Sequence, residues 1–497
     1  MARILGGGAI VSALLCGVAC ANAADEPRDA FFFVNQMNKA SAVMVASTGI
    51  VDRSLGKTIA QSISKVIEDG ARPGAPRPWD YLQVEKQLIA FGGPDVTRLH
   101  SGRSRQDMAS TTQRLFLRDE YLANAAALND YRAALLRFAQ SAPNAIMPAY
   151  TMDVQAQPIT LGHYLSGYLG ALERQSERLQ QAYRRVNLSP LGAAAVGTSS
   201  FPVDRFQLAR SLGFEGPVEN SFDANHVSPF DTGVEAASLA VSSAVTTGAL
   251  MADMLDQYRQ NHPWFRVAAG ETTTSSIMPQ KRNPTTMLSV RKQASQTIGA
   301  AETAILVAHN IAAGTTEYRG DDARDALRGA TQMQAAAARL IGTLEFDAPR
   351  ALEEVAAEYS TTTELADVLQ RDANVPFRVG HHVASELVNY GRAHNLRPSQ
   401  LPFDEVKRVY AAAMKEMMGQ DNAVFPLTEA RFHESLTAEN MVRSSRGLGG
   451  PQPSEVERML KAQEARLAQD RAWFQGQRNA LAAAAGALDV AFEALKK

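Results

Sequence analysis

Apolar and polar positions follow a helical period over most of the chain. The segment from Met108 to Gln140 contains no Gly or Pro, and Leu115, Leu122 and Leu136 fall on one seam at multiples of seven. From Tyr164 to Val186 apolar residues again recur at helical spacings. Strand signals are scarce, and no alternating βα pattern appears. The pattern predicts an all-α protein with a central long-helix bundle and smaller helical domains at both ends.

One predicted helix carries no charge at all. The segment SLAVSSAVTTGALM occupies residues 238–251. A helix that is apolar on every side lies in the centre of a large protein or in a membrane. Its serines and threonines, its length and its single occurrence favour a buried helix of the bundle. A further helical pattern follows Asn283 and runs to about Ala312.

Gly- and Pro-rich stretches divide the helical segments from one another. They occur at residues 70–80, 261–265, 372–377 and 446–454. We expect four parts: a signal peptide at 1–23, an N-terminal helical domain at 24–107, the central bundle at 108–357 and a C-terminal helical domain at 358–497.

The N-terminus has the features of an export signal. Arg3 supplies a positive start, residues 4–19 are apolar and small, and residues 21–23 offer a small-x-small cleavage site. The apolar run is too short and too weakly flanked for a spanning helix. We expect cleavage after Ala23 and a periplasmic or secreted protein. A retained N-terminal helix and a lipoprotein acylated at Cys20 are the alternatives.

Composition narrows the classes of function. Hydrophobic residues make up 45% of the 497, which is ordinary for a soluble globular protein. The formal net charge of −2 argues against a nucleic-acid or anionic-membrane surface as the main function. Both cysteines, Cys16 and Cys20, lie in the predicted signal peptide. A mature chain would therefore have no disulfide, no catalytic thiolate and no cysteine-ligated metal.

The stretch ETTTSSIMPQKRNP, residues 271–284, is the first candidate for chemistry. We expect Asn283 to cap the following helix and Pro284 to be its first residue. A helix N-terminus favours an anion, and Lys281 and Asn283 beside it suit a carboxylate. The small polar residues upstream suit a mobile closing loop. An ordinary capped loop is the alternative.

Two further polar clusters precede predicted helices. In LHSGRSRQD, residues 99–107, Arg103 and Arg105 flank Ser104 and could hold carboxylates. A solvated helix entry with ion pairs is the alternative there. The other cluster, MPAYTMDVQAQPITLGHY at 147–164, contains Thr151, Asp153, Gln155 and Gln157. Mid-chain clusters of this kind are usually loop caps.

Together these stretches resemble segments of one enzyme superfamily. SSIMPQKRNP resembles the signature of the fumarase/aspartase superfamily, and the other two stretches resemble segments of argininosuccinate lyase. Three more segments resemble argininosuccinate lyase in its own order, at 189–205, 212–224 and 361–382. The resemblance spans roughly residues 80–390.

The resemblance implies a fold, a reaction and roles for individual residues. It implies a homotetramer whose active sites combine stretches from three subunits, and a reversible β-elimination that releases fumarate. By similarity, Ser275 is the base, acting as an alkoxide, while Lys281 and Asn283 bind the carboxylate whose charge grows. Ser104 and Thr151 would bind the fumarate half. Further substrate contacts would come from Arg103, Arg105, Gln106, Gln155 and Tyr318.

The same resemblance implies that the reaction needs neither a metal nor an organic cofactor. The implied partners are a small dicarboxylate or amino-acid substrate and further copies of the chain. Nucleic acid is not an expected partner, nor is a membrane once the signal is removed.

Several positions depart from the family pattern. Met152 stands where the family has a histidine near the general-acid side, and methionine cannot donate a proton. Asp153, His226 or water are the substitutes we consider. The remaining departures are Gln106 for asparagine, Thr274 for glycine, and Ala323 and Ala326 for glutamine and lysine.

The matching residues lie on the base and fumarate side, and the altered ones lie on the amine side. We therefore expect an argininosuccinate lyase-like C–N lyase that acts on an N-substituted aspartate, either argininosuccinate or a related adduct. Two other classes stay open. One is a C–O lyase such as a fumarase, whose own flanking motifs are absent. The other is a catalytically silent relative with a binding or structural role, which Met152 favours.

Overall fold

The computed structural model describes residues 27–497, apart from the side chain of Tyr318. The predicted signal peptide, with Cys16 and Cys20, lies outside the described residues. The described chain divides into two compact units, residues 27–99 with Phe492–Lys497 and residues His100–Ala491. The division into N-terminal, central and C-terminal domains at 107 and 357 stays a prediction.

The first unit consists of three helices and a short helical turn. Each helix begins after an aspartate whose carboxylate accepts a backbone N–H of the first turn, as in a standard N-cap. Helix α2 can approach α1 closely because residue 70 is a glycine. A Cβ atom at Gly70 would lie 2.5 Å from the ring of Phe31. The elements are α1 (Ala30–Ser47), α2 (Arg53–Gly70), α3 (Tyr81–Gly92) and η1 (Pro94–His100).

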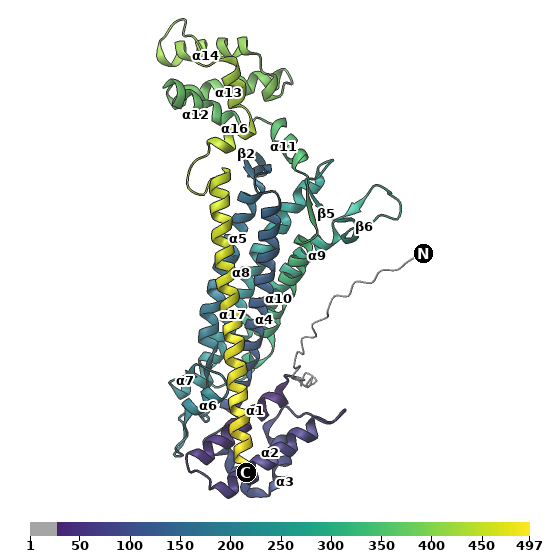
Figure 1. Ribbon diagram of the computed structural model, residues 1–497, viewed down its shortest axis with the longest axis vertical. Helices are drawn as coiled ribbons and strands as arrows, with labels where there is room; N and C mark the ends of the chain where they lie inside the picture. The colour runs from purple at the N-terminus through teal and green to yellow at the C-terminus, as the bar shows by residue number, and fades with distance from the viewer. Residues whose placement is uncertain (1–26) are drawn as a thin grey trace, which may run out of the picture. The chain divides into compact units, whose positions relative to one another are not determined.

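Long helices that run alongside one another form the bundle of the second unit (Figure 1). Their apolar faces make one large core, which includes Leu135, Leu165, Leu250 and Leu340. These residues recur at helical spacing, so the periodicity of the sequence becomes the buried face of each helix. The helices are α4 (Arg105–Ser141), α5 (Leu161–Val186), α8 (Ser228–Asp256), α9 (Thr285–Ala308), α10 (Asp322–Ile341) and α17 (Pro453–Leu495).

The uncharged segment lies in α8, which packs against α5, α9 and α10. Its buried alanines Ala237 and Ala240 meet Ala301 and Ala330 of the neighbouring helices, so the helices approach closely. Within residues 27–497, Ser228–Arg259 is the one stretch long and apolar enough to cross a membrane. Half of that apolar window is buried inside the protein, and a core helix of a soluble protein passes the same test.

An ion pair lies inside the bundle and joins α4 to α17. Arg132 is 1% exposed, and its guanidinium donates to the buried carboxylate of Asp470. Gln180 of α5 donates to the other oxygen of Asp470 at 2.7 Å. A buried charge is tolerated only when it is paired and hydrogen-bonded, so these contacts fix the position of α17 along the bundle.

The strands of the described residues are short and occur in pairs, which is in keeping with the scarce strand signals of the sequence. The longest pair is an antiparallel hairpin whose register runs from Ile146↔Thr160 to Thr151↔Val154, with an irregularity at Ala149/Tyr150. The pairs are β1 (Ile146–Thr151) with β2 (Val154–Thr160), β3 (Leu188–Ser189) with β4 (Gly216–Pro217), β5 (Phe265–Val267) with β8 (Leu344–Phe346), and β6 (Thr273–Thr274) with β7 (Arg282–Asn283).

The remaining helices are shorter and complete the second unit. Helices α12 to α15 enclose a core of their own, which includes Leu369, Leu387 and Phe432. Helix α11 packs against β1, and α16 packs against β2. These helices are α6 (Arg205–Ser211), α7 (Ser221–His226), α11 (Ala348–Ala357), α12 (Thr362–Ala373), α13 (Phe377–Ala393), α14 (Phe403–Met418), α15 (Glu429–Ser435) and α16 (Ala438–Ser444). The predicted all-α architecture around a long-helix bundle is confirmed.

Candidate active site

The loop between β6 and β7 holds the predicted base. The strands pair Thr273 with Asn283 and close the base of the loop. The Oγ atom of Ser275 accepts the backbone N–H groups of Ile277 at 3.3 Å and Met278 at 3.1 Å. Two N–H donors aimed at one oxygen stabilise a negative charge on it. An alkoxide at this serine would therefore have two N–H donors in place.

Lys281 and Asn283 have different surroundings in the same loop. The ammonium of Lys281 is exposed and makes no ion pair or hydrogen bond within residues 27–497. The side-chain amide of Asn283 donates to the carbonyl of Thr273 at 3.1 Å. The prediction that Asn283 caps the next helix is wrong, because β7 and this bond hold it across the loop. The N-cap of α9 is Pro284, and no side chain caps the helix.

The second stretch opens helix α4. Ser104 is the N-cap, and its Oγ accepts the backbone N–H of Gln106 at 3.1 Å. Asp107 completes a capping box, because its Oδ1 accepts the Ser104 N–H at 2.8 Å. Arg103 is buried and Arg105 is exposed. The two arginines flank the N-cap residue of α4 in the sequence, and the N-terminus of a helix favours an anion.

Asp107 was not predicted as a site residue, yet it organises this end of the bundle. Its Oδ2 accepts the backbone N–H groups of Gly192 at 2.9 Å and Ala194 at 3.2 Å. Burial raises the pKa of Asp107 to about 7, although the N–H groups and the charge of Arg103 act to lower it. The signal in the sequence was the Ser-x-x-Asp spacing of the capping box.

The loop that Asp107 holds has an unusual backbone and carries α7. Gly192, Ala194 and Thr198 adopt φ values of 85°, 53° and 62°, in the left-handed region that favours glycine. Asn225 donates to the Ala194 carbonyl at 2.7 Å, which fastens α7 to the loop. Backbone strain of this kind is typical of functional loops.

His226 therefore lies at the same end of the bundle as Ser104. It is buried, and its Nε2 lies 2.9 Å from the Ala195 carbonyl. Its Nδ1 has no hydrogen-bond partner among the described residues. Arg319 donates to the Asn225 carbonyl at 3.1 Å and brings η4 (Glu317–Arg319) to this place. Tyr318 belongs to η4, but its side chain lies outside the described residues.

The third stretch is the β1–β2 hairpin. Its two turn residues, Met152 and Asp153, have φ values of 50° and 61°, as in a tight two-residue hairpin turn. Thr151 is exposed, and Met152 is 98% exposed. Gln155, predicted to contact substrate, donates to the Glu354 carbonyl of α11 at 2.9 Å, and its substrate contact stays a prediction. The hairpin is thus anchored to α11 by a residue close to its turn, while the turn itself is exposed.

One chain does not bring the three stretches together. Ser104 and the hairpin lie beyond opposite ends of α4, whose 37 residues rise about 55 Å at ~1.5 Å each. No hydrogen bond or ion pair within residues 27–497 joins the loop 271–284 to either of the other stretches. The same residues contain no group of three His, Cys, Asp or Glu side chains that could hold a metal ion.

Comparison with known proteins places these stretches in a family context. A family profile described as Lyase matches residues 88–299, and one described as Argininosuccinate lyase C-terminal matches residues 359–443. A structure of EDDS lyase in complex with formate is 29% identical, covers 94% of this chain and 92% of that chain, and gives a TM-score of 0.84. An EDDS lyase variant with bound fumarate is 28% identical, with the same coverage and TM-score.

A more distant structure shares the fold. The fumarate lyase from Mesorhizobium sp. BNC1 is 17% identical, covers 88% of this chain and 96% of that chain, and gives a TM-score of 0.65.

Proposed function

Since the chain belongs to the fumarase/aspartase superfamily of lyases, we propose that it is a C–N lyase that releases fumarate and an amine from an N-substituted aspartate. Argininosuccinate and related adducts are the candidate substrates. The observation that carries the proposal is the Ser275 oxygen, which accepts two backbone N–H groups beside an unpaired lysine. The similarity to EDDS lyase, one structure of which has fumarate bound, supports the same reaction class.

The chemistry begins at the carbon next to a carboxylate, whose proton is very weakly acidic. In the proposed reaction Ser275 takes that proton, a double bond forms, and the bond between the neighbouring carbon and the amine nitrogen breaks. Charge grows on the carboxylate as the proton leaves. Lys281 and the uncapped N–H groups at the start of α9 stabilise that charge.

The other carboxylate and the amine are held by different stretches. Ser104 and Thr151 bind the fumarate half, and Arg103 and Arg105 supply positive charge near Ser104. The amine side of the site has fewer polar side chains than the family pattern has there, because apolar residues replace polar ones at Met152, Ala323 and Ala326. The leaving amine takes its proton from Asp153, His226 or water.

We propose that the active site forms between subunits of a homotetramer. The support is the length of α4, which separates Ser104 from the hairpin within one chain. In an assembly with point symmetry, the start of α4 in one subunit can meet the hairpin and the loop of others. Export to the periplasm or the medium is proposed from residues 1–23, and N-terminal sequencing of the mature protein tests cleavage after Ala23.

A catalytically silent relative is the second candidate, and the observation that favours it is Met152. Its side chain is almost fully exposed at the hairpin tip and has no proton to donate. Such a protein would keep the fold and the anion-binding residues without turnover.

Incubation with a panel of N-substituted aspartates tests the proposal. We expect the purified protein to form fumarate, detected by its ultraviolet absorbance, from at least one member of the panel. Aspartate and malate serve as controls for deamination and for C–O cleavage. If none of the N-substituted aspartates yields fumarate, and fumarate with amines gives no adduct in reverse, the lyase proposal fails.

A further inference from the structure

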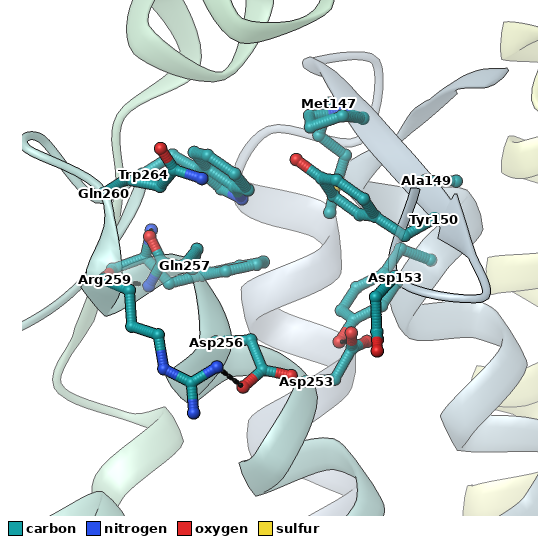
Figure 2. Close-up of a pocket in the computed structure, with 13 residues that line it drawn as sticks. Met147, Ala149, Tyr150, Asp153, Asp253, Asp256, Gln257, Arg259, Gln260 and Trp264 are labelled. Carbon is teal, nitrogen blue, oxygen red and sulfur yellow. Dashed lines mark hydrogen bonds and ion pairs between the residues drawn. The ribbon is translucent and has the colours of Figure 1, made fainter. Parts of the chain in front are cut away.

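A cavity of about 480 Å³ lies beside the β1–β2 hairpin (Figure 2), and neither Ser275 nor Ser104 lines it. Its walls come from β1, the first turn of α5, the end of α8 and the residues that lead into β5. This volume is within the range of about 300–1,000 Å³ that is usual for small-molecule sites. Figure 2 shows Trp264 and Tyr150 on one side of the cavity and Asp253 and Asp256 on the other.

The Trp264 indole offers a hydrogen bond that the protein does not use. The residue is 3% exposed, and its Nε1–H has no partner among the described residues. A buried donor without a partner is costly, and tryptophan N–H groups in protein interiors usually find an acceptor. Because Trp264 lines the cavity, a bound molecule with an acceptor group can satisfy this N–H.

The charge of the lining is negative. Three carboxylates, those of Asp153, Asp253 and Asp256, face one guanidinium, that of Arg259. Arg259 already pairs with Asp256 at 3.4 Å. Asp253 accepts hydrogen bonds from the hydroxyl of Tyr164 at 2.6 Å and from that of Tyr168. Neither Asp153 nor Asp253 forms an ion pair among the described residues. Two carboxylates are therefore available to a cation.

We propose that this cavity binds a small organic amine in its ammonium form. The ammonium lies between Asp153 and Asp253, where carboxylates and the aromatic rings of Tyr150 and Tyr164 both attract a cation. An acceptor group elsewhere on the same molecule receives the N–H of Trp264. The site shares Asp153 and the hairpin with the proposed elimination site, but it uses neither the loop 271–284 nor the start of α4.

Occupancy of the cavity also affects the hairpin tip. Tyr150 and Asp153 lie on either side of the Thr151–Met152 segment, and both line the cavity. A bound amine that contacts both residues holds the tip in one position. This coupling rests on the proposed function, in which Thr151 contacts substrate, whereas binding itself does not.

Calorimetric titration of the full mature chain tests the binding. The probes are aminobutanol, butanediol and hydroxybutyrate, which share a terminal hydroxyl and differ in carrying a positive, no or a negative charge. We expect only aminobutanol to bind. Asp253→Asn should weaken its affinity about tenfold or more, as expected for loss of a charge-assisted hydrogen bond, and Trp264→Phe should weaken it about twofold to tenfold.

A matched control is Asp404→Asn, a surface aspartate in α14 that should leave the affinity unchanged. Circular dichroism confirms that each variant is folded. Equal affinity for the three probes, or full affinity in Asp253→Asn, would overturn the proposal. Titration with the amine that is released in the fumarate assay shows whether the cavity binds the product of the reaction or an unrelated amine. Because calorimetry needs no turnover, a failed lyase assay leaves this result interpretable.

Discussion

Replacement of Ser275 by alanine removes the proposed base and leaves the rest of the loop in place. The Oγ atom bonds only to two N–H groups of its own loop, so its loss should change the free energy of unfolding by less than about 0.5 kcal/mol. Loss of the general base should lower kcat about 10³-fold or more, which corresponds to ~4 kcal/mol of transition-state stabilisation. KM should change little, because Lys281 and Asn283 remain.

The neighbouring serine supplies the matched control. The Ser276 side chain is exposed and makes no hydrogen bond within the described residues, so Ser276→Ala should keep near-full activity. The assay is the initial rate of fumarate formation from the best substrate of the panel, with circular dichroism and thermal unfolding for each variant. If Ser275→Ala keeps its rate within tenfold of the parent, or Ser276→Ala loses as much, the assignment of the base is refuted.

Three further predictions concern assembly and stability. Co-expression of Ser104→Gly with Ser275→Ala should recover about a quarter of the parental rate of fumarate formation. When Ser104 and Ser275 of one site come from different subunits, random mixing gives both intact residues at about one site in four. No recovery would contradict active sites shared between subunits. Burial raises the pKa of Asp107 to about 7, so between about pH 4 and pH 7 this carboxyl holds a proton in the folded chain and has lost it in the unfolded chain. The free energy of unfolding measured in urea should therefore fall as the pH rises over this range. Asp107→Asn should make that free energy depend less on pH. Arg132→Met should cost about 3 kcal/mol in urea unfolding because it leaves Asp470 buried with one charged partner fewer, whereas pairing it with Asp470→Leu should recover most of that loss.

The long helices could be predicted from the sequence because their signal is local and repeated. The periodic segment 108–140 became α4 at 105–141, and 164–186 became α5 at 161–186. The uncharged segment 238–251 lies inside α8. Many turns of consistent spacing outweigh any single residue, so both the type and the approximate length of these elements were accessible.

The details of the site depended on contacts that the sequence does not show. An asparagine before a proline is typical of a helix cap, but Asn283 bonds to Thr273 across a hairpin ten residues long. Asp107 gains its role from Gly192 and Ala194, which lie more than eighty positions away in the chain. Neither partner is implied by local spacing. The resemblance to a family therefore identified the candidate stretches, whereas the local pattern of residues did not predict their hydrogen bonds.

The hairpin turn at Met152 bears on how this chain could have diverged from its relatives. At a φ of 50° histidine and asparagine are more common than methionine, so the backbone here suits the family's histidine at least as well. The methionine side chain is also exposed and packs against nothing that would be disturbed by exchange. The backbone and the exposure of this side chain within one chain therefore give no structural reason for methionine rather than histidine. Met152→His is therefore a direct way to ask what a proton donor at the hairpin tip does to the rate of fumarate formation.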